Sequence, residues 1–346
     1  MTDNHRKCLF ILLNWNGTED TLACCESLAQ DNELYDVLII DNASDEMKYN
    51  MLFEGMHNIA YEIKDVQPDV NGLLGRYEIE VVIFFKNRNK NFTLIRSSVN
   101  HGFAKGCNLG TLYAAEKNYE YILFLNNDTV VESNFFPIMK KTLEKCDAVI
   151  PQIRYYHDKN LIWNCGGNIT KYGKRIYFFA NKKINDVQIE DKDFLISFAT
   201  GCALMFRTHF FIKLGLFSEK FFFGEEDVDL ALRMKAARAK ILCSPKAVIY
   251  HKVGASLAGD NDRAINKSYI HYLNRFVNMK LHLGIEWWLW IFPSIIKVMI
   301  NNKKISKLKL KSNIIFTMNL LFDAINLNSV DKAKFQTVIK KGYPSA

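Results

Sequence analysis

Short apolar runs alternate with amphipathic stretches along the N-terminal third of the chain. Residues 19–30 have the three-to-four-residue apolar spacing of a helix with one face on a core, and residues 103–117 repeat it. The run at 121–125 is almost wholly apolar, which is typical of a strand buried on both faces. The runs of strand length are residues 9–13, 37–40, 92–95 and 121–125. This alternation predicts β-α-β units, and therefore an α/β, Rossmann-like fold with a doubly wound, mainly parallel sheet.

The next part of the chain is less regular. We expect a helix at 133–146, a strand at 148–150, and then an irregular middle, 154–197, rich in aromatic residues and lysine, that builds a substrate face. The stretch 46–91 is longer than a simple connection needs and includes a strand-like run at 79–85. We interpret it as an inserted hairpin or lobe.

Polar clusters follow three of the predicted strands. They are residues 14–17 (Asn-Trp-Asn-Gly), 41–45 (Asp-Asn-Ala-Ser-Asp) and 126–128 (Asn-Asn-Asp). Turns and helix N-caps prefer the same residue types, so each cluster taken alone has a purely structural interpretation. Ligands of open α/β sheets bind at the carboxyl ends of strands, so three such clusters at one rim together predict a binding site.

Composition and charge narrow the classes of function. The 346 residues, 49% of them hydrophobic, suffice for a large core. No Gly-x-Gly-x-x-Gly or P-loop pattern follows a predicted strand, which argues against a dinucleotide-dependent oxidoreductase and a P-loop enzyme. The net charge of +8 suits nucleic acid, an anionic membrane or a phosphorylated substrate, or simply a solvated lysine surface. No nucleic-acid-binding motif accompanies the lysines, so we expect no nucleic-acid partner.

The cysteines and the N-terminus bear on the cellular compartment. The eight cysteines are scattered without the spacing of a zinc site, and we expect free thiols in a reducing compartment. Residues 1–7 are polar and lead into a short apolar run that lacks the long apolar segment and cleavage site of a secretory signal. We therefore expect a cytoplasmic protein.

These features occur together in a known family. From about residue 8 to about residue 279 the chain resembles the family 2 glycosyltransferases, and within them a rhamnosyltransferase-like branch. The shared landmarks, in chain order, are residues 14–17, 41–45, 100–104 with Asn108, 126–128, 224–230 and 250–256. The resemblance implies the GT-A fold and transfer of a hexosyl or deoxyhexosyl group from a UDP- or dTDP-sugar to an acceptor hydroxyl.

The resemblance also implies a divalent cation, Mn²⁺ or Mg²⁺. Asp128 is the last residue of the Asn-Asn-Asp equivalent of the family's Asp-x-Asp motif, and it is expected to bind the cation through oxygen. His251 is expected as a second protein ligand or a diphosphate contact, and imidazole favours Mn²⁺ over Mg²⁺. The structural alternatives are that Asp128 caps the following helix and that His251 is a packed core residue.

A nucleotide-sugar pocket follows from the same resemblance. Asp41, with Asn42 and Asp45 nearby, is expected to receive the base and ribose, because carboxylates accept hydrogen bonds from ribose hydroxyls and from a pyrimidine N–H. The residues expected to contact the donor are Asn14, Asn16, Asp41, Asn42, Asp45, Gly102, Asn108, Asn127 and Gly201.

The acidic stretch near residue 226 matches the family's general base. Glu226 and Asp227 correspond to its Glu-Asp pair, with Asp227 as the base, and direct attack by the acceptor hydroxyl implies inversion at the anomeric carbon. The alternative is that Glu225, Glu226, Asp227 and Asp229 only complement a helix dipole. Helix periodicity lets one or two of the four face a cleft, and we expect the others to face solvent.

The C-terminal region changes character. Residues 285–300 contain three tryptophans and are followed by the lysine-rich stretch 301–311. This segment is too short and interrupted to predict a membrane span, but tryptophan beside lysine suits the surface of a membrane. A helical extension that packs on the catalytic domain or on a partner subunit is the equal alternative, so a homo-oligomer stays open. We divide the chain into a catalytic domain, 1–282, and a helical extension, 283–346.

The membrane interpretation affects the acceptor. A peripheral protein on the cytoplasmic face of the membrane favours a lipid-linked glycan over a soluble glycan, as in synthesis of a surface polysaccharide. Two other classes of function stay open: a catalytically silent relative that binds a nucleotide or glycan, and a basic membrane adaptor.

Overall fold

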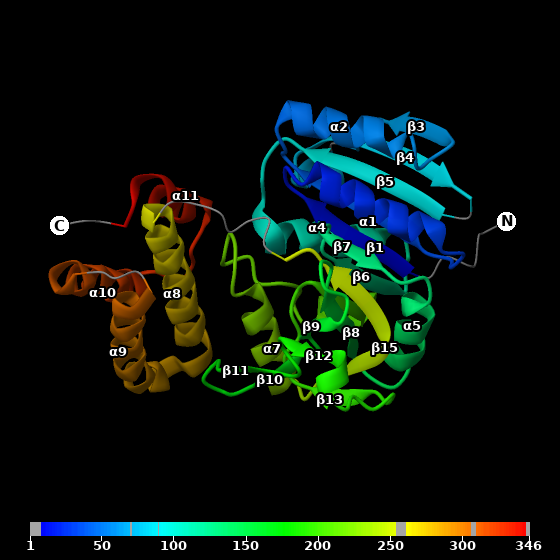
Figure 1. Cartoon of the computed structure of the whole chain (residues 1–346). Coiled ribbons are helices and arrows are strands. Elements are labelled where there is room, and N and C mark those ends of the chain that lie inside the picture. Colours follow the sequence, from blue (N-terminus) through cyan, green and yellow to red (C-terminus); the bar gives the residue numbers. More distant parts are fainter. Residues whose placement is uncertain (1–7, 70, 89, 254–260, 306–308, 344–346) are drawn as a thin grey trace.

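The computed structural model describes residues 8–69, 71–88, 90–253, 261–305 and 309–343. A large sheet with helices on both faces forms most of the molecule, and a group of C-terminal helices lies beside it (Figure 1). The expectations for residues 1–7 and for the last residues of the 250–256 landmark lie outside the described residues.

The centre of the sheet is parallel, as predicted. Its strands are β1 (Cys8–Asn14), β2 (Asp36–Asn42), β5 (Lys90–Ser97) and β6 (Tyr121–Leu125), in the spatial order β6-β1-β2-β5. Their side chains pack alternately into two apolar cores on opposite faces of the sheet. One core includes α1 (Thr18–Gln30), α2 (Glu46–Met56) and α5 (Phe135–Leu143), and the other includes α4 (Gly102–Glu116) and α6 (Thr208–Lys213). The α/β, doubly wound fold is therefore confirmed.

Helix α4 lies close to β1 because two of its residues lack a side chain. A Cβ at Gly106 would approach Leu13 to 2.5 Å, and one at Gly110 would approach Ile11 to 2.5 Å. This contact fixes the start of α4, which bears the 100–104 landmark, against the end of β1.

Antiparallel strands extend the sheet on both sides. Segment 46–91 contains α2, β3 (Glu62–Val66), α3 (Leu73–Arg76) and β4 (Ile79–Asn87), and β4 and β3 continue the sheet beyond β5. Beyond β6 come β14 (Ala203–Arg207), β8 (Ala148–Tyr155), β9 (Leu161–Asn164) and β12 (Lys182–Lys183). Strand β15 (Ile241–His251) pairs with β8, β7 (Thr129–Val131) and β13 (Phe194–Ile196), while β10 (Gly167–Ile169) and β11 (Arg175–Tyr177) form a separate hairpin.

The C-terminal helices form a bundle that packs on the sheet domain through α7 (Glu226–Ala236). They are α8 (Asn261–Leu283), α9 (Trp287–Ile305), α10 (Leu310–Asn326) and α11 (Lys332–Lys341). A third apolar core joins Val228 of α7 to Leu273, Trp287 and Phe316 of the bundle. The Phe222 N–H also donates to the Val330 carbonyl at 2.9 Å, so the segment before α7 is held by the C-terminal region.

Candidate active site

The three polar clusters meet at one edge of the sheet. Asn14 is the last residue of β1 and lies opposite Asp41 of β2. Its Nδ2 donates to Asp41 Oδ2 at 2.7 Å, and its Oδ1 accepts from Thr21 Oγ1 at 3.0 Å. Asn127 Nδ2, from the loop after β6, donates to the same Thr21 hydroxyl at 2.9 Å. Residues far apart in sequence thus form one hydrogen-bonded network at the carboxyl ends of β1, β2 and β6.

Asn16 and Asp45 form the outer part of this network. Asn16 has a φ of 58°, in the left-handed region, and its Oδ1 accepts the Asp45 N–H at 2.8 Å. Asp45 precedes α2, but its side chain makes no capping hydrogen bond and is exposed. The simple N-cap interpretation of Asp45 therefore does not hold.

Asn42 connects the polar cluster after β2 to the start of α4. Its Nδ2 donates to the Gly102 carbonyl at 3.1 Å, and its Oδ1 accepts the His101 N–H at 2.8 Å. Gly102 has a φ of +77°, and a Cβ there would lie 2.2 Å from the Phe222 carbonyl oxygen. The first turn of α4 therefore touches the segment that leads into the acidic helix α7.

Gly201 and Asn108, which were also expected to contact the sugar donor, have different surroundings. Gly201 precedes β14, and a Cβ there would approach the ring of Phe103 to 3.4 Å, so this loop also lies against the start of α4. Asn108 lies apart from the network: its amide donates to the Phe217 carbonyl at 3.0 Å and to Glu219 Oε1 at 2.9 Å, and it accepts the Phe217 N–H. These bonds give the Asn108 side chain a structural function.

Asp128 and His251 are brought together by strand pairing. His251, the last residue of β15, lies opposite Thr129 of β7, directly after Asp128. Asp128 Oδ1 is 3.0 Å from His251 Nε2, and the Lys252 N–H donates to the Asp128 carbonyl at 2.9 Å. Burial disfavours the charged imidazole, but Cys202 and Asp128 outweigh it and raise the pKa of His251 to about 10. Because β7 follows Asp128, this residue does not cap a helix.

The Asp128–His251 pair fits a divalent cation. Asp128 Oδ1 and His251 Nδ1 are buried atoms without a hydrogen-bond partner, and Asp128 Oδ1 makes only the ion-pair contact with His251 Nε2. A carboxylate oxygen and an imidazole nitrogen suit Mn²⁺. Among the described residues, no group of three or more His, Cys, Asp and Glu side chains is arranged to hold a metal. Asp128 and His251 are the two described side chains at this place that could bind a cation.

The acidic residues around the start of α7 are all removed from open solvent to some degree. Glu225 has a φ of 72° and is buried, with Oε1 3.2 Å from Arg275 Nε and Oε2 accepting from Asn278 at 3.2 Å. Asp229 is also buried and pairs with Arg233 at 2.8 Å and His282 at 2.9 Å. The expectation that residues of this group not facing the cleft face solvent is wrong, because α8 covers them.

Glu226 and Asp227 differ from these structural carboxylates. Both are half-buried, and Glu226 Oε2 is a buried atom with no hydrogen bond. Burial and the neighbouring Asp227 raise the pKa of Glu226, while burial and Glu225 raise the pKa of Asp227. Arg175 and Arg275 act in the opposite direction on Asp227. Asp227 is therefore a carboxylate of raised basicity, a property of general bases.

The hairpin residue Arg175 and the helix residues Arg275 and Asn278 were not predicted from the sequence. They lie about 50 residues on either side of Asp227, on elements whose local patterns contain no signal for this site.

Several buried polar side-chain atoms of the candidate site residues and their neighbours make no hydrogen bond. Six buried side-chain atoms of the described residues have no hydrogen-bond partner, and they belong to Asp128, Thr200, Glu226, His251, Asn274 and Asn278. Asn274 and Asn278 bond the backbone of Phe223 and the side chain of Glu225, directly before α7. Folded proteins satisfy nearly all buried polar groups, so the unsatisfied atoms of Asp128, His251 and Glu226 indicate positions that receive polar ligand atoms.

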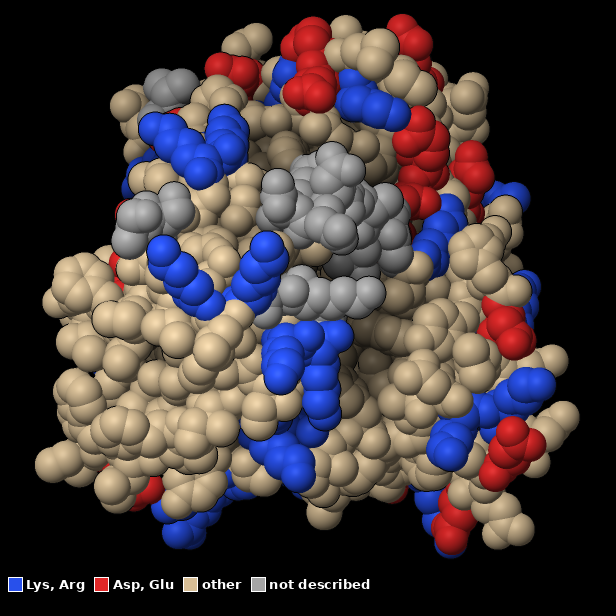
Figure 2. All heavy atoms as spheres, turned by 60° about the vertical axis from the view of Figure 1, so that its left-hand side comes forward, with Lys and Arg blue, Asp and Glu red and all other residues tan. Residues whose placement is uncertain are grey.

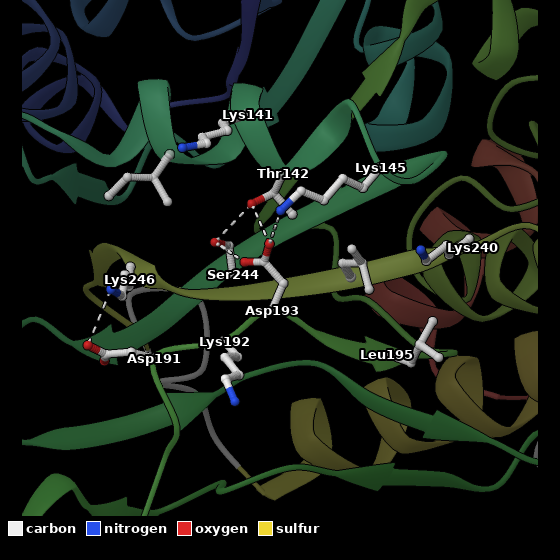
Figure 3. A pocket seen from close by; sticks show the side chains of 12 residues that line it. Lys141, Thr142, Lys145, Asp191, Lys192, Asp193, Leu195, Lys240, Ser244 and Lys246 are labelled. Carbon is white, nitrogen blue, oxygen red and sulfur yellow. Dashed lines mark hydrogen bonds and ion pairs between the residues drawn. The ribbon is translucent and has the colours of Figure 1, made fainter.

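A separate pocket of about 720 Å³ lies between α5, residues 191–195 and the start of β15 (Figure 3). Thr142 Oγ1 donates to Asp193 Oδ2 at 3.0 Å and Ser244 Oγ donates to Asp193 Oδ1 at 2.7 Å, with lysines around them. None of the predicted site residues lines this pocket. Its lining includes the beginning of β15, whereas His251 is at the other end of that strand.

Residues 79–215 match the family described as glycosyl transferase family 2. No curated protein matches the chain.

Solved structures share the fold at low sequence identity. GalNAc-T7, solved with UDP, GalNAc and Mn²⁺, aligns over 93% of this chain and 57% of its own, with 14% identity and a TM-score of 0.52. The mannosyltransferase PcManGT from Pyrobaculum calidifontis, in complex with GDP-Man and Mn²⁺, aligns over 98% of this chain and 85% of its own, with 12% identity and a TM-score of 0.51. This chain spans little more than half the length of GalNAc-T7. The match over residues 79–215 makes this part of the chain similar to glycosyl transferase family 2, and the chain has the GT-A fold of these solved structures.

Proposed function

We propose that this protein is a metal-dependent, inverting glycosyltransferase that moves a sugar from a nucleotide diphosphate to a hydroxyl of a glycan or lipid-linked glycan. The buried polar atoms of Asp128, His251 and Glu226 that make no hydrogen bond support this proposal most strongly. The two solved structures of the same fold contain Mn²⁺ together with UDP or GDP-Man, which supports a nucleotide-sugar donor here. A UDP- or dTDP-sugar and a rhamnosyltransferase-like specificity remain part of the proposal.

The donor would lie along the edge formed by β1, β2 and β6. Asn14 and Asp41 are fully buried and hydrogen-bonded to each other, so they would support from beneath the loops that contact the base and ribose. Asn42 fixes the loop before α4, and the Gly102 backbone lies where no side chain fits. Such preorganised contacts reduce the entropy lost when the donor binds.

Asp128 and His251 would hold the cation beside the diphosphate. A divalent cation supplies charge neutralisation for the diphosphate leaving group. Trp163 packs edge-on to the His251 ring, with 4.6 Å between ring centroids, and so restricts its orientation.

Asp227 would accept the proton of the attacking acceptor hydroxyl. Its raised pKa increases its basicity, and Arg175 and Arg275 keep the pKa from rising further, so that the carboxylate is ionised near neutral pH. Glu226, with the higher pKa, would remain protonated beside it and donate a hydrogen bond to the acceptor or the donor sugar. Direct displacement inverts the anomeric centre.

Hydrolysis of the donor by water tests this function without a known acceptor. Purified protein is incubated with α-linked UDP-, dTDP- and GDP-sugars and Mn²⁺, and the released sugar is followed by NMR before its anomers equilibrate. An inverting enzyme releases the β anomer first together with the nucleoside diphosphate. Release of the α anomer contradicts inversion, and a complete lack of turnover with every donor favours the catalytically silent relative.

A further inference from the structure

The helical bundle exposes two apolar stripes. One side of α9 faces the core: Trp287 is 1% exposed and donates its indole N–H to the Phe276 carbonyl. The other side of α9 faces outward, and Leu289 there is 78% exposed. On α10, Phe316 is buried and Phe322 is 68% exposed. The exposed residues, mostly four apart, are Trp288, Leu289, Phe292, Ile296 and Ile300 on α9, and Leu310, Ile314, Met318, Phe322 and Ile325 on α10. Spacing of four places each set on one face of its helix.

The two helices are fixed to each other. Asn302 Nδ2 donates to Asn313 Oδ1 at 3.1 Å, and Asn313 Nδ2 donates to the Met299 carbonyl at 2.8 Å. Both asparagines are buried, so the contact between α9 and α10 is specific. We call the ten exposed residues the apolar face. Scattered apolar residues are normal on protein surfaces, but ordered rows on two adjoining helices indicate a binding surface.

Lysines accompany the apolar face. Residues 283–346 contain ten lysines and only three acidic residues. Lys297, Lys303, Lys304, Lys309 and Lys311 are exposed on or next to α9 and α10, and none forms an ion pair with another described residue. Figure 2, which turns the bundle toward the reader, shows a wide area without charged side chains that is bordered by lysine and arginine.

We propose that the apolar face docks on the surface of a lipid bilayer with anionic headgroups, with α9 and α10 lying in the plane of the membrane. Exposed tryptophan, phenylalanine and leucine would enter the boundary of the acyl chains, and the lysines would contact the headgroups. A span across the bilayer fits less well. Residues 264–304 are long and apolar enough by composition, but Trp287, Ile291 and Val298 are already buried against the bundle.

Charge distinguishes a bilayer from a second copy of this chain. Two copies that met through the apolar face would bring two groups of lysines together with few acidic partners, and like charges oppose such a contact. An anionic headgroup layer instead complements both the apolar stripes and their lysine border.

Docking would orient the candidate active site. Helix α8 of the bundle holds the residues before α7, through Asn274 to the Phe223 carbonyl at 2.8 Å and through Arg275 to Glu225. The apolar face and Asp227 therefore belong to one connected structure. If the chain has the proposed function, on which this step rests, this orientation favours an acceptor that is itself anchored in the membrane.

Vesicle flotation tests the docking directly. The full chain is mixed with phosphatidylcholine vesicles or with vesicles that also contain phosphatidylglycerol, and the floating fraction is measured at low and high salt. We expect flotation with the anionic vesicles, roughly tenfold weaker binding to neutral vesicles, and partial release by salt. The double variant Leu289→Glu/Phe292→Glu should lose binding, whereas Gln336→Glu/Thr337→Glu, which adds the same charges to exposed positions of α11, should bind better than the first variant.

Other outcomes would overturn the proposal. Wild-type protein that floats with neither vesicle type, or a Leu289→Glu/Phe292→Glu variant that binds as the wild type does, contradicts it. A stable dimer in light scattering that this variant converts to a monomer assigns the face to a second copy. Circular dichroism shows whether either variant is misfolded. If the apolar-face variant is misfolded, Lys303→Glu/Lys304→Glu provides the test, and we expect it to lose the preference for anionic over neutral vesicles. Because flotation measures binding alone, its failure leaves the transferase proposal standing.

Discussion

Asp128 Oδ1 lies 3.0 Å from His251 Nε2, although the two residues are separated by more than 120 positions in the sequence. The antiparallel pairing of β7 with β15 creates this proximity, since His251 is opposite Thr129. Both side chains retain a buried polar atom with no hydrogen bond. This pair, at the edge where three polar strand ends meet, is the basis of the proposed metal site.

Removing either side chain should abolish binding of the metal. We expect Asp128→Asn and His251→Ala to lose the Mn²⁺-dependent part of the thermal shift produced by a nucleotide sugar, because each removes one protein ligand. Asp65→Asn, which removes an exposed carboxylate from the edge strand β3, is the matched control and should behave like the wild type. An unchanged Mn²⁺ response in both site variants would locate the cation elsewhere.

The same substitution, Asp to Asn, should affect catalysis at position 227 of α7 and stability at position 229. Asp227→Asn should lower kcat by about 10²–10⁴-fold with little change in donor affinity, because it removes the proposed base. Asp229→Asn should instead destabilise the fold by about 1–3 kcal/mol, since Asp229 pairs with Arg233 and His282. Steady-state kinetics and thermal unfolding of both variants check this. Near-normal kcat for Asp227→Asn would exclude its role as base.

The pKa values of the acidic pair predict the pH profile. A base is active when deprotonated, so kcat should fall as the pH drops through about 6, the raised pKa of Asp227. Arg175 lowers this pKa, and Arg175→Gln should therefore move the acidic limb of the profile to higher pH. Lys174→Gln removes the same charge from the adjacent, exposed position and should leave the limb in place. A limb that does not move in Arg175→Gln argues against Asp227 as the titrating group.

Glu226 should destabilise the folded protein when the pH is above the ordinary pKa of a glutamate side chain. Burial and Asp227 raise its pKa in the folded protein to about 8, so the folded state binds the proton more tightly than the unfolded state does. The stability that protonation contributes is fully present below the unfolded pKa and is lost as the pH rises through 8. Glu226→Gln should thus gain stability over the wild type, by on the order of 1–2 kcal/mol at pH 8, and little below pH 4.5. Thermal unfolding across this range would contradict the prediction if the gain were the same at every pH.

Gly102 should tolerate no side chain. A Cβ there would lie 2.2 Å from the Phe222 carbonyl oxygen, whereas Gly284, also at positive φ, has no atom within 4 Å of such a Cβ. Gly102→Ala should therefore destabilise the protein by about 2 kcal/mol or more and reduce activity by displacing the segment before α7. Gly284→Ala carries the backbone strain alone, about 1 kcal/mol, and should keep full activity. If Gly102→Ala and Gly284→Ala lost the same amount of stability and of activity, the contact of Gly102 with Phe222 would be unimportant.

The sequence predicts the elements of this fold well where the pattern is local. The apolar runs became β1, β2, β5 and β6, and the polar residues after them met as expected, because parallel strands bring their carboxyl ends to one edge. The antiparallel flanks carry a weaker signal: the runs at 79–85 and 148–150 indicate β4 and β8, but the other flanking strands are not predicted. Strands such as β13, three residues long, gain their structure from pairing with β15.

The surroundings of the acidic residues could not be predicted in the same way. We expected the acidic residues of this group that do not face a cleft to face solvent, because α7 taken alone offers no partner for Glu225 and only Arg233 for Asp229. Arg275 and His282 reach them from α8, which packs on α7 through an apolar core that no spacing within α7 reveals. Asn108 was expected to contact the sugar donor because of its residue type. In the structure its amide nitrogen and its amide oxygen both hydrogen-bond to the backbone of Phe217.

A thermal-shift screen of UDP-, dTDP- and GDP-sugars with and without Mn²⁺ tests the proposed metal-dependent donor site most directly. A ligand that binds only the folded state raises its apparent stability. We predict a shift for one class of nucleotide that requires Mn²⁺ and disappears in Asp128→Asn. Well-folded wild-type protein that shows no shift with any of these donors, or the same shift in Asp128→Asn, would contradict a metal-dependent donor site at the ends of β1, β2 and β6.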